Sequence, residues 1–137
     1  MNSVVYSFDS RWEEPLRSGK VKVFFRKRRP VVTPSRVYFY IGVPVKTIIG
    51  FAKVKNIEEA NLGSAIKIKR SGSITENELV GYIGPVGTVS AIWIEAPTLF
   101  SRPFSLADLN ERIGFNPPQS FSKVSKEFED LLLEALE

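Results

Sequence analysis

The side chains of this sequence that point most directly to chemistry are the cations of residues 18–29, SGKVKVFFRKRR. Residues 20–26 alternate between apolar and mostly charged positions, which predicts a half-buried strand, and residues 26–29 are four consecutive cations. A basic groove beside an aromatic ring suits single-stranded nucleic acid, and Phe24 would supply that ring. Alternatively, Phe24 lies in the core and the cations only keep the surface soluble. Because adjacent cations repel each other and contribute nothing to a core, we favour binding of a polyanion.

The charge of the whole chain is unevenly distributed around a net value of +4. Residues 1–36 hold nine Lys or Arg against three acids, whereas residues 126–137 hold one Lys against five acids. Clustered positive charge attracts polyanions and gives a salt-sensitive affinity for phosphates. Four lysines on neighbouring predicted strands would form either a second binding face or the solvent-exposed side of an ordinary hairpin. The sequence looks the same in both cases, and we favour the hairpin. These lysines are Lys53, Lys55, Lys67 and Lys69.

Cysteine and histidine are both absent from the 137 residues. This excludes a disulfide framework, a thiol nucleophile, a zinc site of the Cys/His kind and a Ser-His-Asp triad within them. Catalysis would have to use carboxylates, lysines, hydroxyls or backbone dipoles, and the weak candidates are Lys20 or Lys22 with Glu13 or Glu14. We expect no metal and no cofactor. The glycine-rich residues 84–87 lack the lysine and hydroxyl of a phosphate-binding loop, so a turn explains them.

The elements that position these residues follow from periodicity and capping signals. Strands are predicted at residues 4–8, 20–26, 36–41, 47–57 with a bulge at Gly50, 65–69 and 89–95. Helices are predicted at residues 11–17, 75–83, 106–112 and 125–136, the first opened by a capping box of Ser10 and Glu13. This order predicts an α+β fold, a small mixed β-barrel of five or six strands flanked by short helices, with a C-terminal amphipathic helix.

Length and composition are those of one ordinary globular domain, with 43% hydrophobic and 25% charged residues. We expect residues 1–121 to form the domain and residues 122–137 a helix packed on it. No apolar run is long enough to span a membrane and no signal peptide is recognisable, so the expected compartment is the cytoplasm and no membrane partner is expected. Trp12 and Trp93 are expected in the core rather than as platforms for bases.

Five motifs follow one another along most of the chain: SG at residues 18–19, FRKR at 25–28, PVKTIIG at 44–50, SLADL at 105–109 and PPQSF at 117–121. In this order and spacing they resemble archaeal proteins of the ASCH group in the PUA-like superfamily. The resemblance implies a PUA-like β-barrel with a cleft between the barrel and the helices, and a role in binding RNA or modified nucleotides.

ASCH proteins carry a Gly-x-Lys-x-x-x-x-Arg signature beside that cleft. Gly19 and Arg26 match it here, but Val21 stands at the lysine position. Some members are amidohydrolases that deacetylate a modified cytidine with that lysine and a threonine three residues later, where this chain has Phe24. Valine and phenylalanine can take neither role, and Lys22 would substitute only after a slip of the strand.

The primary hypothesis is therefore a non-catalytic nucleic-acid-binding module, for RNA rather than DNA, such as a regulator or an RNA-processing accessory. The cations would hold phosphates, an aromatic ring would stack a base, and polar groups near the C-terminus would read base edges. The predicted set is Lys22, Phe24, Arg26, Arg28, Arg29, Tyr40, Lys46, Gln119 and Ser120. The alternatives are an amidohydrolase acting on a modified nucleoside, and a protein-interaction domain. We expect a monomer or a weak homodimer formed through the C-terminal helix.

Overall fold

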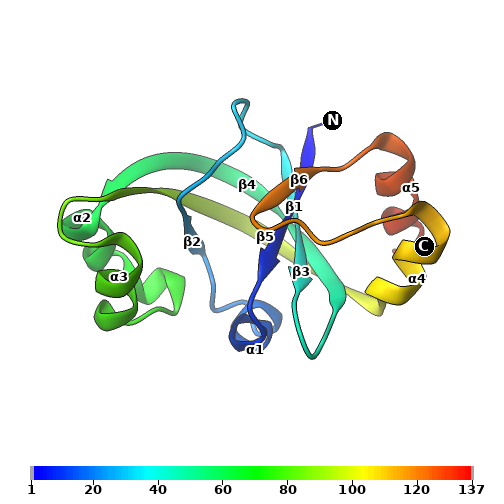
Figure 1. Ribbon diagram of the computed structural model, residues 1–137, viewed down its shortest axis with the longest axis horizontal. Coiled ribbons are helices and arrows are strands. Elements are labelled where there is room, and N and C mark those ends of the chain that lie inside the picture. The colour runs from blue at the N-terminus through cyan, green and yellow to red at the C-terminus, as the bar shows by residue number, and fades with distance from the viewer. Residues whose placement is uncertain (1, 137) are drawn as a thin grey trace.

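The computed structural model describes residues 2–136, in which six strands form one mixed sheet with short helices beside it (Figure 1). The strands are β1 (Ser3–Phe8), β2 (Val23–Arg26), β3 (Arg36–Ile41), β4 (Thr47–Asn61), β5 (Thr88–Ser105) and β6 (Phe121–Lys123). Their order across the sheet is β2-β5-β4-β3-β1-β6, with β1 and β3 parallel and the other neighbours antiparallel. The sheet curls into a half-barrel, which agrees with the α+β prediction.

The long strands β4 and β5 form an arched ribbon whose bending begins at Gly50. The register between the two strands shifts at three places, the first of them between Ile48 and Gly50. A Cβ at Gly50 would collide with the carbonyl oxygen of Thr98 and lie 2.9 Å from Cα of Leu99. Glycine therefore permits the close approach of the two strands, and the predicted bulge at this position is confirmed.

Helices gather at the two ends of this ribbon, so that α2 and α3 lie at one end and α4 and α5 at the other (Figure 1). A 3-10 turn, η1, precedes α1, which lies beside the middle of the sheet, and a second turn, η2, joins α2 to α3. Their bounds are η1 (Ser10–Trp12), α1 (Glu13–Arg17), α2 (Leu62–Lys67), η2 (Lys69–Gly72), α3 (Glu76–Ile83), α4 (Leu106–Ile113) and α5 (Lys126–Glu134). None of the helices within residues 2–136 is long and apolar enough to cross a membrane.

Two local predictions are wrong, one because a cap starts a helix that was not expected and one because the expected cap does not form. The strand predicted at 65–69 is helical, since Asn61 accepts a hydrogen bond from the Ser64 amide at 2.9 Å and Ser64 Oγ accepts one from the Asn61 amide at 3.0 Å. The capping box predicted at Ser10 is absent among the described residues, because Asp9 is the cap residue of η1 and makes no side-chain bond there. Glu13 instead accepts a hydrogen bond from Arg17 at 3.0 Å.

Strand β2 is shorter and more deeply buried than its alternating sequence predicts. It begins at Val23, and both Phe24 and Phe25 are buried although they point to opposite faces. Phe24 packs with β1 and the end of α1, whereas Phe25 packs with α2 and α3. The prediction of one solvent-exposed face on this strand is therefore wrong, since helices cover one side and the curled sheet the other.

The C-terminal helix α5 is anchored to the sheet by a buried carboxylate. Oε2 of Glu129 accepts hydrogen bonds from Ser3 Oγ at 2.7 Å and from the Tyr38 hydroxyl at 2.8 Å, and it pairs with Arg36 Nη1 at 3.2 Å. Burial raises the pKa of the Tyr38 hydroxyl. Phe128 is buried beside these groups. The expected division at 121/122 falls within β6, which pairs with β1, and it stays a prediction.

Candidate functional site

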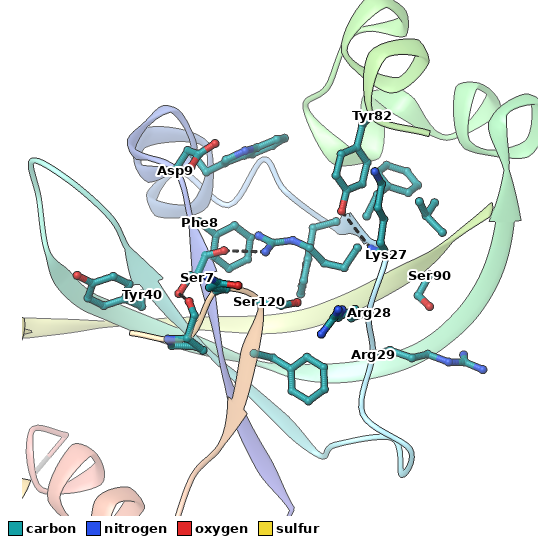
Figure 2. Close-up of a pocket in the computed structure, with 18 of the residues that line it drawn as sticks. Ser7, Phe8, Asp9, Lys27, Arg28, Arg29, Tyr40, Tyr82, Ser90 and Ser120 are labelled. Atoms are coloured by element: carbon teal, nitrogen blue, oxygen red, sulfur yellow. Dashed lines mark hydrogen bonds between the residues drawn. The ribbon is translucent and has the colours of Figure 1, made fainter. Parts of the chain in front are cut away.

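A cleft of about 1550 Å³ opens on the sheet at the end of β2. Side chains from β1, β2, β3, α3 and the segment 117–121 line it, together with the basic segment, residues 26–29. Figure 2 shows Tyr40 on one side of this cleft and Tyr82 with Lys27 on the other, with Ser7 and Ser120 between them. Segments that lie far apart in the sequence thus meet around a single opening.

Arg26, the first cation of the basic segment, is a partly buried cation held over aromatic rings. Its Nη1 donates a hydrogen bond to the Ser7 carbonyl oxygen at 2.7 Å, and its guanidinium carbon lies 4.5 Å from the centre of the Phe8 ring. Within residues 2–136 no carboxylate lies within ion-pair distance of it. Burial consequently lowers the pKa of Arg26 from its usual value. A desolvated cation of this kind gains strongly from an anionic ligand.

The rest of the basic segment has a fixed backbone and exposed side chains. The Lys27 amide donates to the Tyr82 hydroxyl at 3.1 Å, and the Tyr6 hydroxyl donates to the Arg28 carbonyl oxygen at 3.0 Å. The side chains of Lys27, Arg28 and Arg29 are exposed, and none of them forms an ion pair with any described residue. The segment therefore presents three unpaired charges on a rigid support.

The segment 117–121 provides uncharged hydrogen-bonding groups opposite these cations. The Ser7 amide donates to the Ser120 carbonyl oxygen at 3.1 Å, and Ser7 Oγ donates to the Pro118 carbonyl oxygen at 2.6 Å, which fixes the segment against β1. Gln119 and Ser120 line the cleft. The Tyr40 side chain is only 4% exposed, and burial raises its pKa, so the hydroxyl is neutral at neutral pH.

Most of the predicted site residues meet at this cleft. It is lined by seven of the nine: Phe24, Arg26, Arg28, Arg29, Tyr40, Gln119 and Ser120. Lys46 is exposed on the turn that follows the lining residues Gly42 and Val43, and its amide donates to the Gly42 carbonyl oxygen at 3.2 Å. Lys22 is not in the lining, and its amide donates to the Ser71 carbonyl oxygen.

Phe24 cannot take the stacking role expected of it. Its side chain is 3% exposed, and its ring packs against the rings of Tyr6 and Phe8 at centroid distances of 5.2 and 5.1 Å. The hydrophobic core therefore uses both faces of β2. The alternative that Phe24 lies in the core is therefore confirmed, whereas the cations that follow it, residues 26–29, line the cleft.

The weak catalytic candidates lie outside the cleft. Lys20 and Lys22 are exposed and absent from its lining, while Val21 between them is 4% exposed in the core, so no slip of the strand turns a lysine inward. Glu13 is also absent from the lining and is paired with Arg17. The amidohydrolase alternative is therefore not favoured.

The pattern of lysines predicted on a hairpin does not form. Lys67 ends α2 and Lys69 begins η2, so neither residue lies on a strand next to Lys53 and Lys55 of β4. The four lysines were expected on the solvent-exposed side of a hairpin, and this expectation is wrong because residues 65–69 do not form a strand. All four lie outside the cleft lining.

Sequence reasoning missed Tyr82, an aromatic residue of the cleft. Its helix α3 buries Leu79 and Ile83, and Tyr82 lies beside that stripe with 36% of its surface exposed. The helical period was the available signal for its exposure, because it places a large ring off the buried face, but only the fold brings this ring next to the basic segment. Trp12 also lines the cleft, whereas Trp93 lies outside it and donates to Glu58 at 3.0 Å.

Comparisons with known proteins identify close relatives. No protein-family model matches the chain. A Zymomonas mobilis protein described as an ASCH domain-containing ribonuclease is 32% identical over 124 residues, which cover 86% of this chain and 83% of that protein. Because this relative is bacterial, the archaeal part of the resemblance stays a prediction.

Solved structures agree with the fold. The crystal structure of ASCH from Zymomonas mobilis has a TM-score of 0.87 at 29% identity and covers 96% of this chain and 94% of that one. A tyrosine-to-phenylalanine variant of that protein has a TM-score of 0.88 at 28% identity over 98% of both chains. A serine-to-alanine variant has a TM-score of 0.85 at 28% identity and covers 96% and 94%. The predicted PUA-like α+β fold is confirmed.

Proposed function

Since the chain belongs to the ASCH domain family, we propose that it binds single-stranded RNA in the cleft between the basic segment and the segment 117–121. The observation that carries this proposal is the set of cations along one wall. Lys27, Arg28 and Arg29 are exposed and have no described carboxylate partner, while Arg26 is a desolvated cation facing the same space. Phosphates of a nucleic-acid backbone would neutralise them.

The shape of the cleft favours a single strand over a duplex. Tyr40 is buried and Ser7 is half-buried in this cleft, so a base or sugar that projects from its strand would reach them most easily. The bases of an A-form duplex are stacked inside, and its readable major groove is too narrow for side chains. Single-stranded segments, in contrast, can turn a base into a pocket.

The opposite wall favours RNA over DNA. Gln119 and Ser120 offer amide and hydroxyl groups that can donate to or accept from a 2′-hydroxyl or a base edge. The relative described as a ribonuclease supports the same choice of nucleic acid. The affinity would come mainly from released counterions and the selectivity from this neutral wall.

Titrations with short fluorescent oligonucleotides of one sequence test the proposal. We expect single-stranded RNA to bind more tightly than duplex RNA or single-stranded DNA, and Gln119→Ala to reduce the preference for RNA over DNA. Asn116→Ala, a change outside the cleft lining, is the matched control and should leave that preference unchanged. Equal binding of duplex and single strand would contradict the proposal, as would no binding at all.

Cleavage of the bound RNA is a second candidate function. A relative with this fold is described as a ribonuclease, and its solved variants replace a serine and a tyrosine. Tyr40, Ser120 and Arg26 all line this cleft. In such a cleavage the 2′-oxygen would bond to phosphorus and lose its proton to water, while the bond from phosphorus to the 5′-oxygen breaks. A neutral tyrosine would give its proton to the departing 5′-oxygen and recover one from water, and a desolvated guanidinium would stabilise the charge that develops on the phosphoryl oxygens.

Incubation with single-stranded RNA and gel analysis distinguishes cleavage from simple binding. The cleavage candidate predicts fragments that disappear when a 2′-deoxy residue replaces the nucleotide at the cut and that decrease strongly with Tyr40→Phe. Tyr38→Phe, a buried tyrosine outside the cleft, is the control. If the wild type binds RNA without producing fragments, cleavage is rejected and binding stands.

We propose that the chain acts as a monomer in the cytoplasm. The apolar side chains of Phe128 and Leu132 are buried against the chain's own sheet rather than left for a partner. Light scattering of the full chain should give the mass of one copy. A concentration-dependent doubling of that mass would instead support the weak homodimer.

A further inference from the structure

We propose that Tyr82 is the platform on which one base of the bound RNA stacks, an inference that deepens and rests on the proposed function. Tyr82 lies on α3 at the edge of the cleft, next to the basic segment (Figure 2). Its side chain is 36% exposed, far more than the 3% of Phe24 or the 4% of Tyr40. A ring with that much accessible surface can receive a base without rearranging the core.

The group that lies over the Tyr82 ring is a solvent-exposed cation and not a core side chain. The Lys27 Nζ lies 4.9 Å from the centre of the ring, and the Lys27 side chain is exposed and forms no ion pair with any described residue. No apolar core residue has to move for a base to take that place. The displaced ammonium would then be available to a phosphate of the same nucleotide.

The orientation of the ring is fixed before any ligand arrives. The Tyr82 hydroxyl accepts a hydrogen bond from the Lys27 amide at 3.1 Å, so the ring and the basic segment are joined. A preorganised ring costs little conformational entropy when a base stacks on it. This contact also sets the distance between the stacked base and the adjacent phosphate-binding cations.

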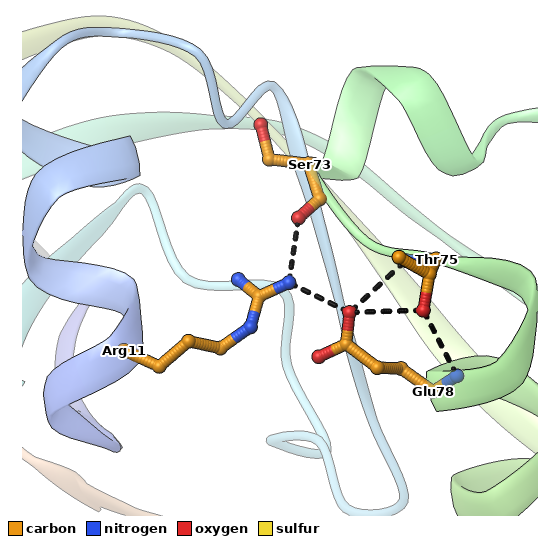
Figure 3. A network of polar contacts seen from close by, with 4 residues as sticks. All are labelled: Arg11, Ser73, Thr75 and Glu78. Atoms are coloured by element: carbon orange, nitrogen blue, oxygen red, sulfur yellow. Dashed lines mark hydrogen bonds and ion pairs between the residues drawn. The ribbon is translucent and has the colours of Figure 1, made fainter.

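Helix α3, which carries Tyr82, is itself held against the η1 turn. Arg11 Nη2 donates to Glu78 Oε1 at 2.7 Å and to the Ser73 carbonyl oxygen at 2.9 Å (Figure 3). Glu78 also forms a capping box with Thr75 at the start of the helix. Because Glu78 precedes Tyr82 by four residues, roughly one helical turn, these contacts fix the part of the helix that bears the ring.

The other aromatic residues of the cleft are less suitable as platforms. The guanidinium carbon of Arg11 lies 3.9 Å from the centre of the Trp12 ring. This guanidinium is held over the ring by its bonds to Glu78 and to the Ser73 carbonyl oxygen, whereas Lys27 has no ion-pair partner among the described residues. Phe121 packs against Tyr6 at a centroid distance of 5.3 Å. Phe8 and Phe25 are buried. Tyr82 thus combines exposure, a fixed orientation and adjacent cations.

A cycle that combines protein variants with abasic oligonucleotides tests the assignment. The probe is a short single-stranded RNA in which each position in turn carries an abasic residue. For the wild type, we expect one position whose abasic form binds about tenfold more weakly, the loss typical of a missing stack. With Tyr82→Ala, the intact RNA should lose about the same factor, and the abasic residue at that position should cost nothing further.

Two further variants separate stacking from packing. Tyr82→Phe keeps the ring and should remain within about threefold of the wild type, whereas Tyr82→Leu keeps apolar bulk without a π-face and should behave like Tyr82→Ala. Circular dichroism checks that each variant is folded. If Tyr82→Leu binds as the wild type does, or if losses from abasic residues and from Tyr82→Ala simply add, the platform is refuted while RNA binding stands. If the wild type binds no RNA, both proposals fall.

Discussion

Replacing Arg28 and Arg29 together by glutamine removes two of the three exposed cations of the basic segment and leaves Lys27. The two side chains make no ion pair with any described residue, so their loss should not unfold the protein. If they contact phosphates, the variant should bind single-stranded RNA more weakly and with a smaller dependence on salt. The salt dependence is the more informative of the two effects, because it counts neutralised phosphates.

The magnitude follows from the number of cations. Each phosphate neutralised on a single strand contributes about −0.7 to the slope of log K against log salt. The four cations of the basic segment, Arg26 included, therefore predict about −2.8 for the wild type, and the two that remain predict about −1.4 for the variant. Between about 50 and about 200 mM KCl, the wild type should lose about 50-fold in affinity and the variant about sevenfold. Fluorescence anisotropy at several salt concentrations measures both slopes.

The matched control replaces Lys53 and Lys55, two exposed lysines of β4 outside the cleft lining, by glutamine. It has the same change of net charge, so a general effect of charge would appear in both variants. The reasoning is refuted if the control flattens the slope as much as the arginine variant does. A wild-type slope near zero would refute it as well, because phosphate contacts would then be absent.

Two further predictions concern the contacts that hold the helices. Glu129→Ala leaves buried polar partners unsatisfied and should lower the free energy of unfolding, measured by urea denaturation, by about 3 kcal/mol. The control Glu127→Ala, on the exposed face of α5, should change this free energy by less than about 0.5 kcal/mol. The hydrogen bond from Arg11 lowers the pKa of Glu78 below 4.5, so its stabilising contribution is complete above that value and is lost as the pH falls through the lowered pKa. The stability of Glu78→Gln should accordingly fall less between about pH 6 and about pH 3 than that of the wild type, and Glu76→Gln should resemble the wild type. Parallel curves for Glu78→Gln and the wild type would contradict this.

The parts of the fold that could be predicted are those in which local signals and tertiary packing agree. The capping residues and early acids before α3 predicted that helix, and the apolar stripe of residues 125–136 predicted α5. The strand at residues 36–41 was predicted to the residue, because the two prolines before it and the glycine after it limit its length. In these places, neighbouring residues determine the structure.

The failures have two kinds of cause, a cap a few residues away and contacts with distant segments. Residues 65–69 alternate like a strand, but the cap at Asn61 starts a helix a few residues earlier. The three residues of β6 carry no strong strand signal of their own and become a strand by pairing with β1. The resemblance pointed to the segment that holds Gln119, but only the fold shows that Gln119 lines the same cleft as the basic segment. The role of Phe24 was mistaken because the curvature of the sheet, which buries it, is not visible in a local pattern.

The central claim is that single-stranded RNA occupies the cleft bounded by residues 26–29, α3 and residues 117–121. Amide chemical shifts of the isotope-labelled chain, followed by NMR during titration with a short single-stranded RNA, test it most directly. The account predicts that the largest changes fall on these three segments, while α4 and α5 at the other end of the sheet stay unchanged. It is contradicted if the changes concentrate at α4 and α5, or on the lysines of α2 and η2, and leave the cleft unaffected.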